Sequence, residues 1–233
     1  MSSVLILIPT YNEAVNVSRL LREILKNSAA DVLVIDDNSP DGTGSLVAAI
    51  ARGNPRIQVL HRPKKLGLAS AYREGFFWAL RQGYEFIVQM DCDLSHDPKY
   101  LPLLLEHAKY HDLVVGSRYI PGGALIGLNC WRRMLSKVGN LYVLLLLGWK
   151  DHTFVLQDAT GGFNCWRAEL LRNVSAKHLR FRGYGFQVEL KWRACLSGAS
   201  IMELPIVFRN RVSGKSKFSP NTVAEAMLLP FRL

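Results

Sequence analysis

The sequence predicts an α/β fold in which helices cover both faces of a mostly parallel sheet. Short apolar runs of strand length alternate with segments whose apolar residues recur at helical spacing. The runs are continuously apolar rather than alternating, which is typical of parallel strands buried on both faces. The 233 residues, 49% of them apolar, suffice for one domain with a substantial core.

Five strands are expected in the first half of the chain. They cover residues 4–8, 32–35, 57–60, 86–90 and 113–115. Between the first two strands, Val17, Leu20 and Ile24 recur at helical spacing. The remaining helices are expected over 43–51, over 69–82 and from about Pro98, because proline fits the first turn of a helix.

The second half is less regular, so we expect a single domain with an annexed C-terminal portion, divided into a first half, residues 1–116, and a second half, residues 117–233. Its predicted elements are helices over 131–147 and 188–196, a strand over 201–207 broken by Pro205, and a helix-like end over 222–229. That end is too short to span a bilayer and apolar enough to lie on one.

Charge divides the chain in the same way. Residues 1–116 carry 12 basic and 13 acidic side chains, whereas residues 117–233 carry 17 basic and 6 acidic ones. Such an asymmetry points to an anionic partner of the second half: nucleic acid, a phospholipid surface or a phosphorylated substrate. A basic surface facing only solvent explains the charge equally well.

Two further observations concern the cellular compartment. The four cysteines form no C-x-x-C pair, which favours a reducing compartment over a disulfide or zinc scaffold. No apolar run approaches the ~20 residues of a membrane span, and the N-terminus has no signal-peptide pattern. We therefore expect a cytoplasmic protein.

Polar clusters follow four of the predicted strands. They are the segments 9–13, 36–42, 91–93 and 116–118. In a parallel sheet the carboxyl ends of the strands share one edge, where ligands bind. Turn chemistry explains any one of these clusters, but four together predict a site.

Asp91-x-Asp93 is the most specific of these patterns. Two carboxylates at a strand end suit a hard cation such as Mg²⁺, which uses one or two carboxylates together with substrate phosphates. The alternative is a turn before Pro98, in which Asp97 caps the following helix.

Asp36 and Asp37 can accept hydrogen bonds from a ribose or a base, or cap the helix at 43–51. Tyr11 can stack on a base or simply pack.

Phosphate binding would have to use basic side chains, because the sequence has neither G-x-G-x-x-G nor a P-loop motif. Candidates are Arg118, the pair Arg132 and Arg133, and the basic loop from Arg211 to Lys217. An exposed helix face and a surface loop are the respective alternatives. His96 is more simply a packed loop histidine than a ligand.

Taken together, the motifs resemble the family-2 glycosyltransferases of the GT-A fold, which is a Rossmann-like fold. Within that family they are most similar to the enzymes that make dolichyl- or polyprenyl-phosphate mannose. The segments that carry the resemblance are 8–13, 34–43, 65–72, 91–98, 116–119, 161–163 and 211–217. Ser95 and Asn164 stand where family members often have a glutamine and an arginine.

The resemblance implies a function for each of these segments. Residues 1–116 would form the nucleotide-binding half and 117–233 the half that binds the acceptor and phosphates. The residues implied to hold the sugar nucleotide are Pro9, Tyr11, Glu13, Ile35, Asp37, Asp91, Cys92, Asp93, Arg118, Arg211 and Lys217. Asp91 and Asp93 would bind Mg²⁺ or Mn²⁺, and Arg133 and Ser136 the acceptor phosphate. Asp91, Asp93, Arg118 and Lys217 are the residues implied to be catalytic.

The implied reaction is an inverting transfer of mannose from GDP-mannose to a dolichyl or polyprenyl phosphate. An acceptor phosphate with a second pKa near ~6 is largely ionised at pH 7, so it can attack without a catalytic base. Another donor such as UDP-glucose, on the same fold, remains open. A nonenzymatic module that binds nucleic acid is the alternative of another class, and we expect no nucleic-acid partner.

The lipid acceptor implies a place at a membrane. We expect peripheral binding to the cytoplasmic face, either through the basic second half and the apolar stretches 141–147 and 226–231 or through a membrane-anchoring partner protein.

Overall fold

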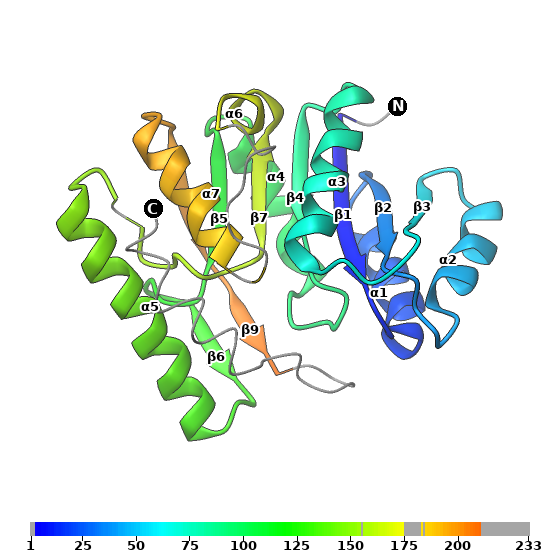
Figure 1. Ribbon diagram of the computed structural model, residues 1–233, viewed down its shortest axis with the longest axis horizontal. Coiled ribbons are helices and arrows are strands. Elements are labelled where there is room, and N and C mark those ends of the chain that lie inside the picture. Colours follow the sequence, from blue (N-terminus) through cyan, green and yellow to red (C-terminus); the bar gives the residue numbers. More distant parts are fainter. Residues whose placement is uncertain (1–2, 155, 175–182, 184, 211–233) are drawn as a thin grey trace.

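The computed structural model describes residues 3–154, 156–174, 183 and 185–210. Within these residues the chain forms a seven-stranded sheet and a separate two-stranded ribbon, with helices packed on both faces of the large sheet (Figure 1). This confirms the predicted α/β class.

The expected strands of the first half are all present. They are β1 (Val4–Thr10), β2 (Asp31–Asp36), β3 (Ile57–His61), β4 (Phe86–Gln89) and β5 (Leu113–Ser117). The helices that follow them are α1 (Ala14–Asn27), α2 (Thr43–Arg52), α3 (Leu68–Arg81) and α4 (Leu101–Ala108). A short 3₁₀ turn, η1 (Pro98–Tyr100), precedes α4, and the Asp97 side chain caps it by accepting from the Lys99 amide.

The elements of the second half are less evenly spaced. They are β6 (Ala124–Ile126), α5 (Cys130–Lys150), β7 (Asn164–Arg167), α6 (Ala168–Asn173), α7 (Gly185–Leu196), β8 (Ile201–Pro205) and β9 (Val207–Arg209). The predicted helix-like end at 222–229 lies outside the described residues.

The strand order of the large sheet is β3-β2-β1-β4-β7-β5-β8. All neighbouring pairs are parallel except those of β7, which runs antiparallel to both β4 and β5. The sequence does not predict β7, whose four residues are Asn-Cys-Trp-Arg. Side-chain bonds hold it to β4, because Trp166 Nε1 and Asn164 Nδ2 both donate to Gln89 Oε1, at 2.7 and 3.1 Å.

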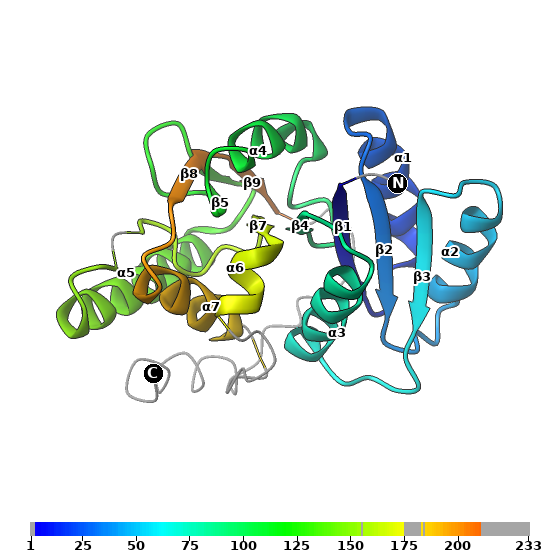
Figure 2. The ribbon, with the colours of Figure 1, turned by 90° about the horizontal axis from the view of Figure 1, so that it is seen from above.

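Two apolar clusters lie on opposite faces of the sheet. One packs α1, α2 and α4 against it, and the other packs α3, α5, α6 and α7, as the view from above shows (Figure 2). The approach of α3 is close, since a Cβ at Gly75 would lie 2.6 Å from Ile35 Cδ1 and 2.9 Å from Leu7 Cδ1. The apolar runs are therefore buried on both faces, as the sequence predicts.

Pro205 ends one strand and redirects the chain to another sheet. β8 pairs with β5 up to Pro205, and β9 then pairs with β6 in the two-stranded ribbon. The sequence-predicted break at Pro205 is thus the point where the chain changes sheets, which fits the loss of a backbone donor at proline. Among the helices of the described residues, none is both long and apolar enough to cross a membrane.

Candidate functional site

The ends of β1 and β2 bring the first predicted site residues together. In the parallel register Pro9 lies opposite Ile35 and Thr10 opposite Asp36. The Asp37 amide continues the pairing by donating to the Thr10 carbonyl at 3.0 Å. Pro9, Tyr11 and Asp37 therefore lie at one edge of the sheet, as the sequence predicts.

Asp37 is buried and organises the loop after β3. Its Oδ1 forms an ion pair with the buried Arg62, and its Oδ2 accepts from the Leu66 and Gly67 amides at 3.2 and 2.9 Å. A nucleoside that met this carboxylate would use its remaining lone pairs. Arg62, which the sequence analysis did not single out, thus fixes the orientation of Asp37.

Neither Asp36 nor Asp37 caps α2, so that alternative is wrong. Asp36 instead accepts from Thr10 Oγ1 at 2.9 Å and from the Ser39 hydroxyl at 2.5 Å. The carboxylate at the start of α2 is Asp41, which accepts from the Thr43 amide at 3.0 Å. The side chain of Asp36 is therefore committed to shaping the turn beside Asp37.

The other three predicted nucleoside residues differ in exposure. Tyr11 is half-buried, and Lys65 Nζ lies 4.0 Å from its ring centroid. Glu13 is buried and accepts from Asn16 Nδ2 at 2.9 Å. The Ile35 side chain is fully buried under α3, so this residue can offer a ligand only its main chain. Ile35 therefore stays a predicted nucleoside contact, made through its main chain.

Asp91 and Asp93 follow β4 in a tightly bonded turn, and both are half-buried. Asp93 Oδ1 accepts from the Ser95 amide at 3.1 Å and from its hydroxyl at 2.5 Å. The Asp91 amide donates to His96 Nδ1 at 3.1 Å, so that nitrogen carries no proton. Burial lowers the pKa of His96, which keeps its ring neutral against Phe163, 5.0 Å away between ring centroids.

This donor set fits a hard divalent cation. The two carboxylates lie one residue apart at a strand end, and the Cys92 side chain between them is turned into the core. Mg²⁺ and Mn²⁺ bind such oxygen ligands and take others from substrate phosphates and water. The sequence prediction of a metal at Asp91 and Asp93 stays a prediction, with chemically suitable residues.

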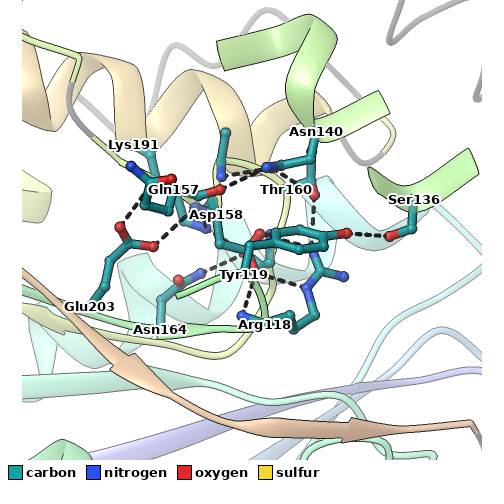
Figure 3. A network of polar contacts seen from close by, with 12 residues as sticks. Arg118, Tyr119, Ser136, Asn140, Gln157, Asp158, Thr160, Asn164, Lys191 and Glu203 are labelled. Atoms are coloured by element: carbon teal, nitrogen blue, oxygen red, sulfur yellow. Dashed lines mark hydrogen bonds and ion pairs between the residues drawn. The ribbon is translucent and has the colours of Figure 1, made fainter. Parts of the chain in front are cut away.

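Arg118 forms a buried ion pair that the sequence does not predict. Its Nε and Nη2 donate to the two carboxylate oxygens of Asp158 at 2.7 and 2.8 Å, and its own amide adds a 3.0 Å bond (Figure 3). The ion pair is buried, with 11% exposure of the arginine side chain and none of the aspartate. The ion pair holds Arg118 in place, and the contact with a substrate phosphate implied by the resemblance stays a prediction.

The Asp158 loop, residues 157–161, is held from three sides. Lys191 Nζ on α7 donates to the carbonyls of Asp158 and Gly161 at 3.0 and 2.7 Å. Glu203 on β8 accepts from the amides of Gln157 and Asp158 at 2.7 and 2.9 Å. Asn140 on α5 donates to the Gln157 carbonyl at 2.7 Å and accepts from the Ala159 amide at 3.0 Å (Figure 3).

Opposite charges determine the protonation states in this loop. Burial alone would raise the pKa of Asp158, but the charge and hydrogen bonds of Arg118 outweigh it and hold that pKa well below its usual range. Burial works to lower the pKa of Arg118, and Asp158 reverses the effect and raises it. Burial dominates at Lys191 and lowers its pKa to about 8, with Asp158 opposing the shift.

The Asp158 loop leads directly to the β4 carboxylates. A Cβ at Gly162 would lie 4.0 Å from Asp91 Oδ2 and 3.6 Å from His96 Cε1. These are ordinary van der Waals distances, so Gly162 lies directly beside the Asp91 carboxylate. The Asp158 loop is thus a neighbour of the predicted metal ligands.

The predicted acceptor residues lie on α5, next to the same loop. The Ser136 hydroxyl lies 2.7 Å from the Tyr119 hydroxyl, and Tyr119 directly follows Arg118 (Figure 3). Arg133, one turn before Ser136, is exposed in the first turn of the helix. Arg211 and Lys217 lie outside the described residues.

Sequence reasoning missed Asp158 and Lys191. Asp158 precedes the Gly161-Gly162-Phe163 segment that the resemblance includes, and this proximity was the available signal. Lys191 lies in the middle of a helix on which apolar and polar residues alike are buried, so periodicity did not mark it.

The comparisons with known proteins agree with this geometry. The sequence profile of glycosyl transferase family 2 matches residues 5–164. An undecaprenyl-phosphate mannosyltransferase of Micrococcus luteus is 43% identical over 97% of this chain and 91% of its own. A polyprenol monophosphomannose synthase of Mycolicibacterium smegmatis is 42% identical over 96% and 83% of the two chains.

Solved structures share the fold at low identity. Glucosyl-3-phosphoglycerate synthase of Mycobacterium tuberculosis, solved with UDP, superposes with a TM-score of 0.68 at 17% identity, over 98% of this chain and 79% of its own. The mannosyltransferase PcManGT of Pyrobaculum calidifontis, solved with GDP-Man and Mn²⁺, gives 0.58 at 19% identity, over 92% and 58%.

Proposed function

The chain belongs to glycosyl transferase family 2 and is a glycosyltransferase, and from that premise we propose that it moves mannose from GDP-mannose to a polyprenyl phosphate. Dolichyl phosphate is one acceptor of this class. The observation that carries the proposal is identity above 40%, along nearly the whole chain, to two enzymes named for making polyprenyl-phosphate mannose. Because the chain is an enzyme, the alternative of a nonenzymatic module that binds nucleic acid is wrong.

The donor would lie at the edge of the sheet where β1, β2 and β4 end. We assign the nucleoside to Tyr11, Asp37 and the main chain of Pro9 and Ile35, with Glu13 supporting the turn from below. Asp37 can accept from the base while Arg62 holds it in place. GDP is the nucleotide in the structure of the archaeal mannosyltransferase, which supports guanosine without deciding it for this chain.

The diphosphate and a divalent metal would lie at Asp91, the Cys92 main chain and Asp93. Mg²⁺ or Mn²⁺ bound there would neutralise the charge that develops on the leaving diphosphate. The half-buried carboxylates suit this role because Ser95 orients the Asp93 carboxylate and His96 holds the main chain of Asp91. Mn²⁺ accompanies GDP-Man in the archaeal structure.

The acceptor phosphate would lie near Arg133 and Ser136 on α5. Arg118 remains a proposed phosphate contact, and its guanidinium also positions the Asp158 loop through the ion pair. Arg211 and Lys217 remain proposed phosphate contacts from the part of the chain outside the described residues.

The chemistry needs positioning more than proton transfer. An acceptor phosphate monoester is largely ionised at pH 7 and can attack the anomeric carbon directly, which inverts its configuration. Asp158, the carboxylate of the adjoining loop, accepts four hydrogen bonds from Arg118 and Gly161 and stays ionised. We therefore assign it to holding the loop and not to general base catalysis.

A lipid acceptor also requires contact with a membrane. We propose peripheral association with the cytoplasmic face, by the chain itself or through an anchoring partner protein. The excess of basic residues after residue 117 supports attraction to anionic headgroups.

A panel of sugar nucleotides tests the proposal. Purified protein is incubated with Mg²⁺ or Mn²⁺, a short water-soluble polyprenyl phosphate, and GDP-mannose, UDP-glucose or UDP-galactose in parallel. The expected product has the mass of polyprenyl-phosphate mannose and forms only from GDP-mannose. A hexose product that forms from UDP-glucose instead would replace mannose by glucose in the assignment.

A further inference from the structure

α5 carries a row of large apolar side chains that face away from the protein. We define the α5 stripe as Trp131, Met134, Val138, Leu141, Leu145 and Trp149. Their exposure ranges from 48% at Met134 to 84% at Trp149. They recur every three or four residues and so form one continuous face over the 21-residue helix.

The opposite face of α5 packs against the protein. Val143 and Leu147 are buried in the core, and Asn140 holds the Asp158 loop. At 100° per residue the stripe is centred almost opposite these three residues. The predicted apolar stretch 141–147 is thus divided between two faces, and only Leu141 and Leu145 of it belong to the stripe.

Single exposed apolar residues are ordinary, whereas a continuous row of six marks an interaction surface. Figure 1 shows α5 on the outer flank of the molecule, where such a surface is accessible. The charge of the helix indicates the kind of partner. α5 carries Arg132, Arg133, Lys137 and Lys150 and no acidic residue.

Charge also distinguishes between the partners that could cover the α5 stripe. A second copy would bring two basic helices together without an acidic partner on either. The C-terminal segment 211–233 has four basic residues and one acidic residue, so it is basic as well. An anionic lipid surface offers both the apolar layer and the opposite charge, and tryptophans at both ends of the helix suit the interface between water and hydrocarbon.

We propose that the α5 stripe docks on an anionic bilayer, with the helix lying along its surface. This rests on the proposed function, since a polyprenyl phosphate is the reason for reaching a membrane. Docking by this helix places Arg133 and Ser136, the assigned acceptor-phosphate residues, at the level of the lipid headgroups. The Asn140 bonds then connect the docked helix to the Asp158 loop beside Asp91.

The test is a pair of matched double variants of the full chain. Leu145→Ser with Trp149→Ser changes the end of the stripe far from Arg133 and Ser136. Tyr110→Ser with Leu196→Ser removes apolar residues that are exposed to 77% and 49% on other elements. Binding is measured by co-sedimentation with vesicles of phosphatidylglycerol and phosphatidylcholine, and with phosphatidylcholine alone.

We expect the stripe variant to partition into the anionic vesicles at least tenfold more weakly than the wild type, and the control variant to bind within twofold of it. The wild type should bind vesicles of phosphatidylcholine alone several-fold more weakly. On a short water-soluble acceptor the stripe variant should turn over within twofold of the wild type. A wild type that binds vesicles but glycosylates no soluble acceptor would reject the proposed function and leave the docking surface standing.

Three results would overturn the docking proposal. One is equal sedimentation of the stripe variant and the wild type with anionic vesicles. Another is a wild-type dimer in sedimentation velocity that the stripe variant converts to monomer, because the stripe would then bind a second copy. The third is slow maleimide labelling of Leu145→Cys without vesicles, because the chain itself would then cover the stripe.

Discussion

Asp158 lies against Gly161 and Asp91 beside Gly162, the next residue, yet their carboxylates have opposite surroundings. Asp91 and Asp93 are half-buried, and the turn that carries them is fixed largely through the Asp91 main chain and one oxygen of Asp93. Asp158 is fully buried, and each of its oxygens accepts two hydrogen bonds. Asp91 and Asp93 suit a bound cation, whereas Asp158 is already paired with the cationic Arg118.

The difference shows how to separate a ligand-binding charge from a structural one. A buried charge that has its counter-charge and all its hydrogen bonds inside the protein holds the fold, and removing one member leaves the other uncompensated. A charge with an exposed side keeps its capacity for a ligand. Substitutions in the two regions should therefore affect different measurements.

The largest expected effect is on turnover, at the β4 carboxylates. Asp91→Asn with Asp93→Asn should lower kcat by roughly 10²–10⁴-fold, since a bound metal contributes several kcal/mol of charge stabilisation in the transition state. The free energy of unfolding, measured in urea, should change by less than about 1 kcal/mol. Asp97→Asn is the matched control, and should keep both its turnover and its stability to within about 0.5 kcal/mol, because asparagine caps as well as aspartate. Near-normal turnover of the double variant, or no effect of EDTA, would remove the metal from this site.

At Asp158 we expect a substitution to lower stability rather than turnover. Asp158→Asn should lower the free energy of unfolding by about 3–5 kcal/mol, because Arg118 is left buried with an uncompensated charge. The combined variant Arg118→Met with Asp158→Leu should recover part of that loss. Urea unfolding of the wild type, Arg118→Met, Asp158→Leu and the combined variant forms a double-mutant cycle. A coupling energy near zero would mean that the pair does not stabilise the loop.

A smaller loss of stability is expected at Lys191. Lys191→Met should cost about 1–3 kcal/mol, because the buried carbonyls of Asp158 and Gly161 lose their donor. Lys26→Met, at an exposed position of α1, is the control and should lie within about 0.5 kcal/mol of the wild type. Thermal and urea unfolding measure both. If the two variants were equally stable, Lys191 would not hold the loop.

A gradual effect of similar size is a pH dependence from the same lysine. Burial lowers the pKa of Lys191 to about 8 from its ordinary 10.5, so between these values the unfolded chain binds a proton that the folded chain does not. Through this group alone stability should rise with pH from 8 to 10.5, by up to about 1 kcal/mol per pH unit. Lys191→Met should lack that rise. Parallel slopes for wild type and variant across this range would contradict the assignment.

The same contrast explains how much the sequence predicts. The five strands of the first half are evident because each is a continuous apolar run. Asp91 and Asp93 are evident because their chemistry is contained in three consecutive residues. Arg118 and Asp158 are 40 positions apart, so sequence reasoning could see the arginine as a cation but not its partner. The ion pair therefore could not be predicted from the sequence, whereas the phosphate contact of Arg118 stays a prediction.

β7 was missed for a related reason. Two of its four residues are polar, and its place in the sheet depends on Gln89, 75 and 77 positions from its bonding partners Asn164 and Trp166. Local preference gives no hint of such a strand, because tertiary contacts determine it. Lys191 is similar, since only the fold brings the Asp158 and Gly161 carbonyls to it.

The position of β7 also dictates an order of assembly. Within the large sheet, β5 pairs only with β7 and β8, and both are synthesised after it. Roughly 46 residues separate the end of β5 from the start of β7, which is several seconds of translation at ~5–20 residues per second. During that time β1 to β4 can pair with one another, whereas the strands that pair with β5 have not yet been synthesised. In pulse-labelling hydrogen exchange during refolding, the β5 amides should gain protection no earlier than those of β7 or β8.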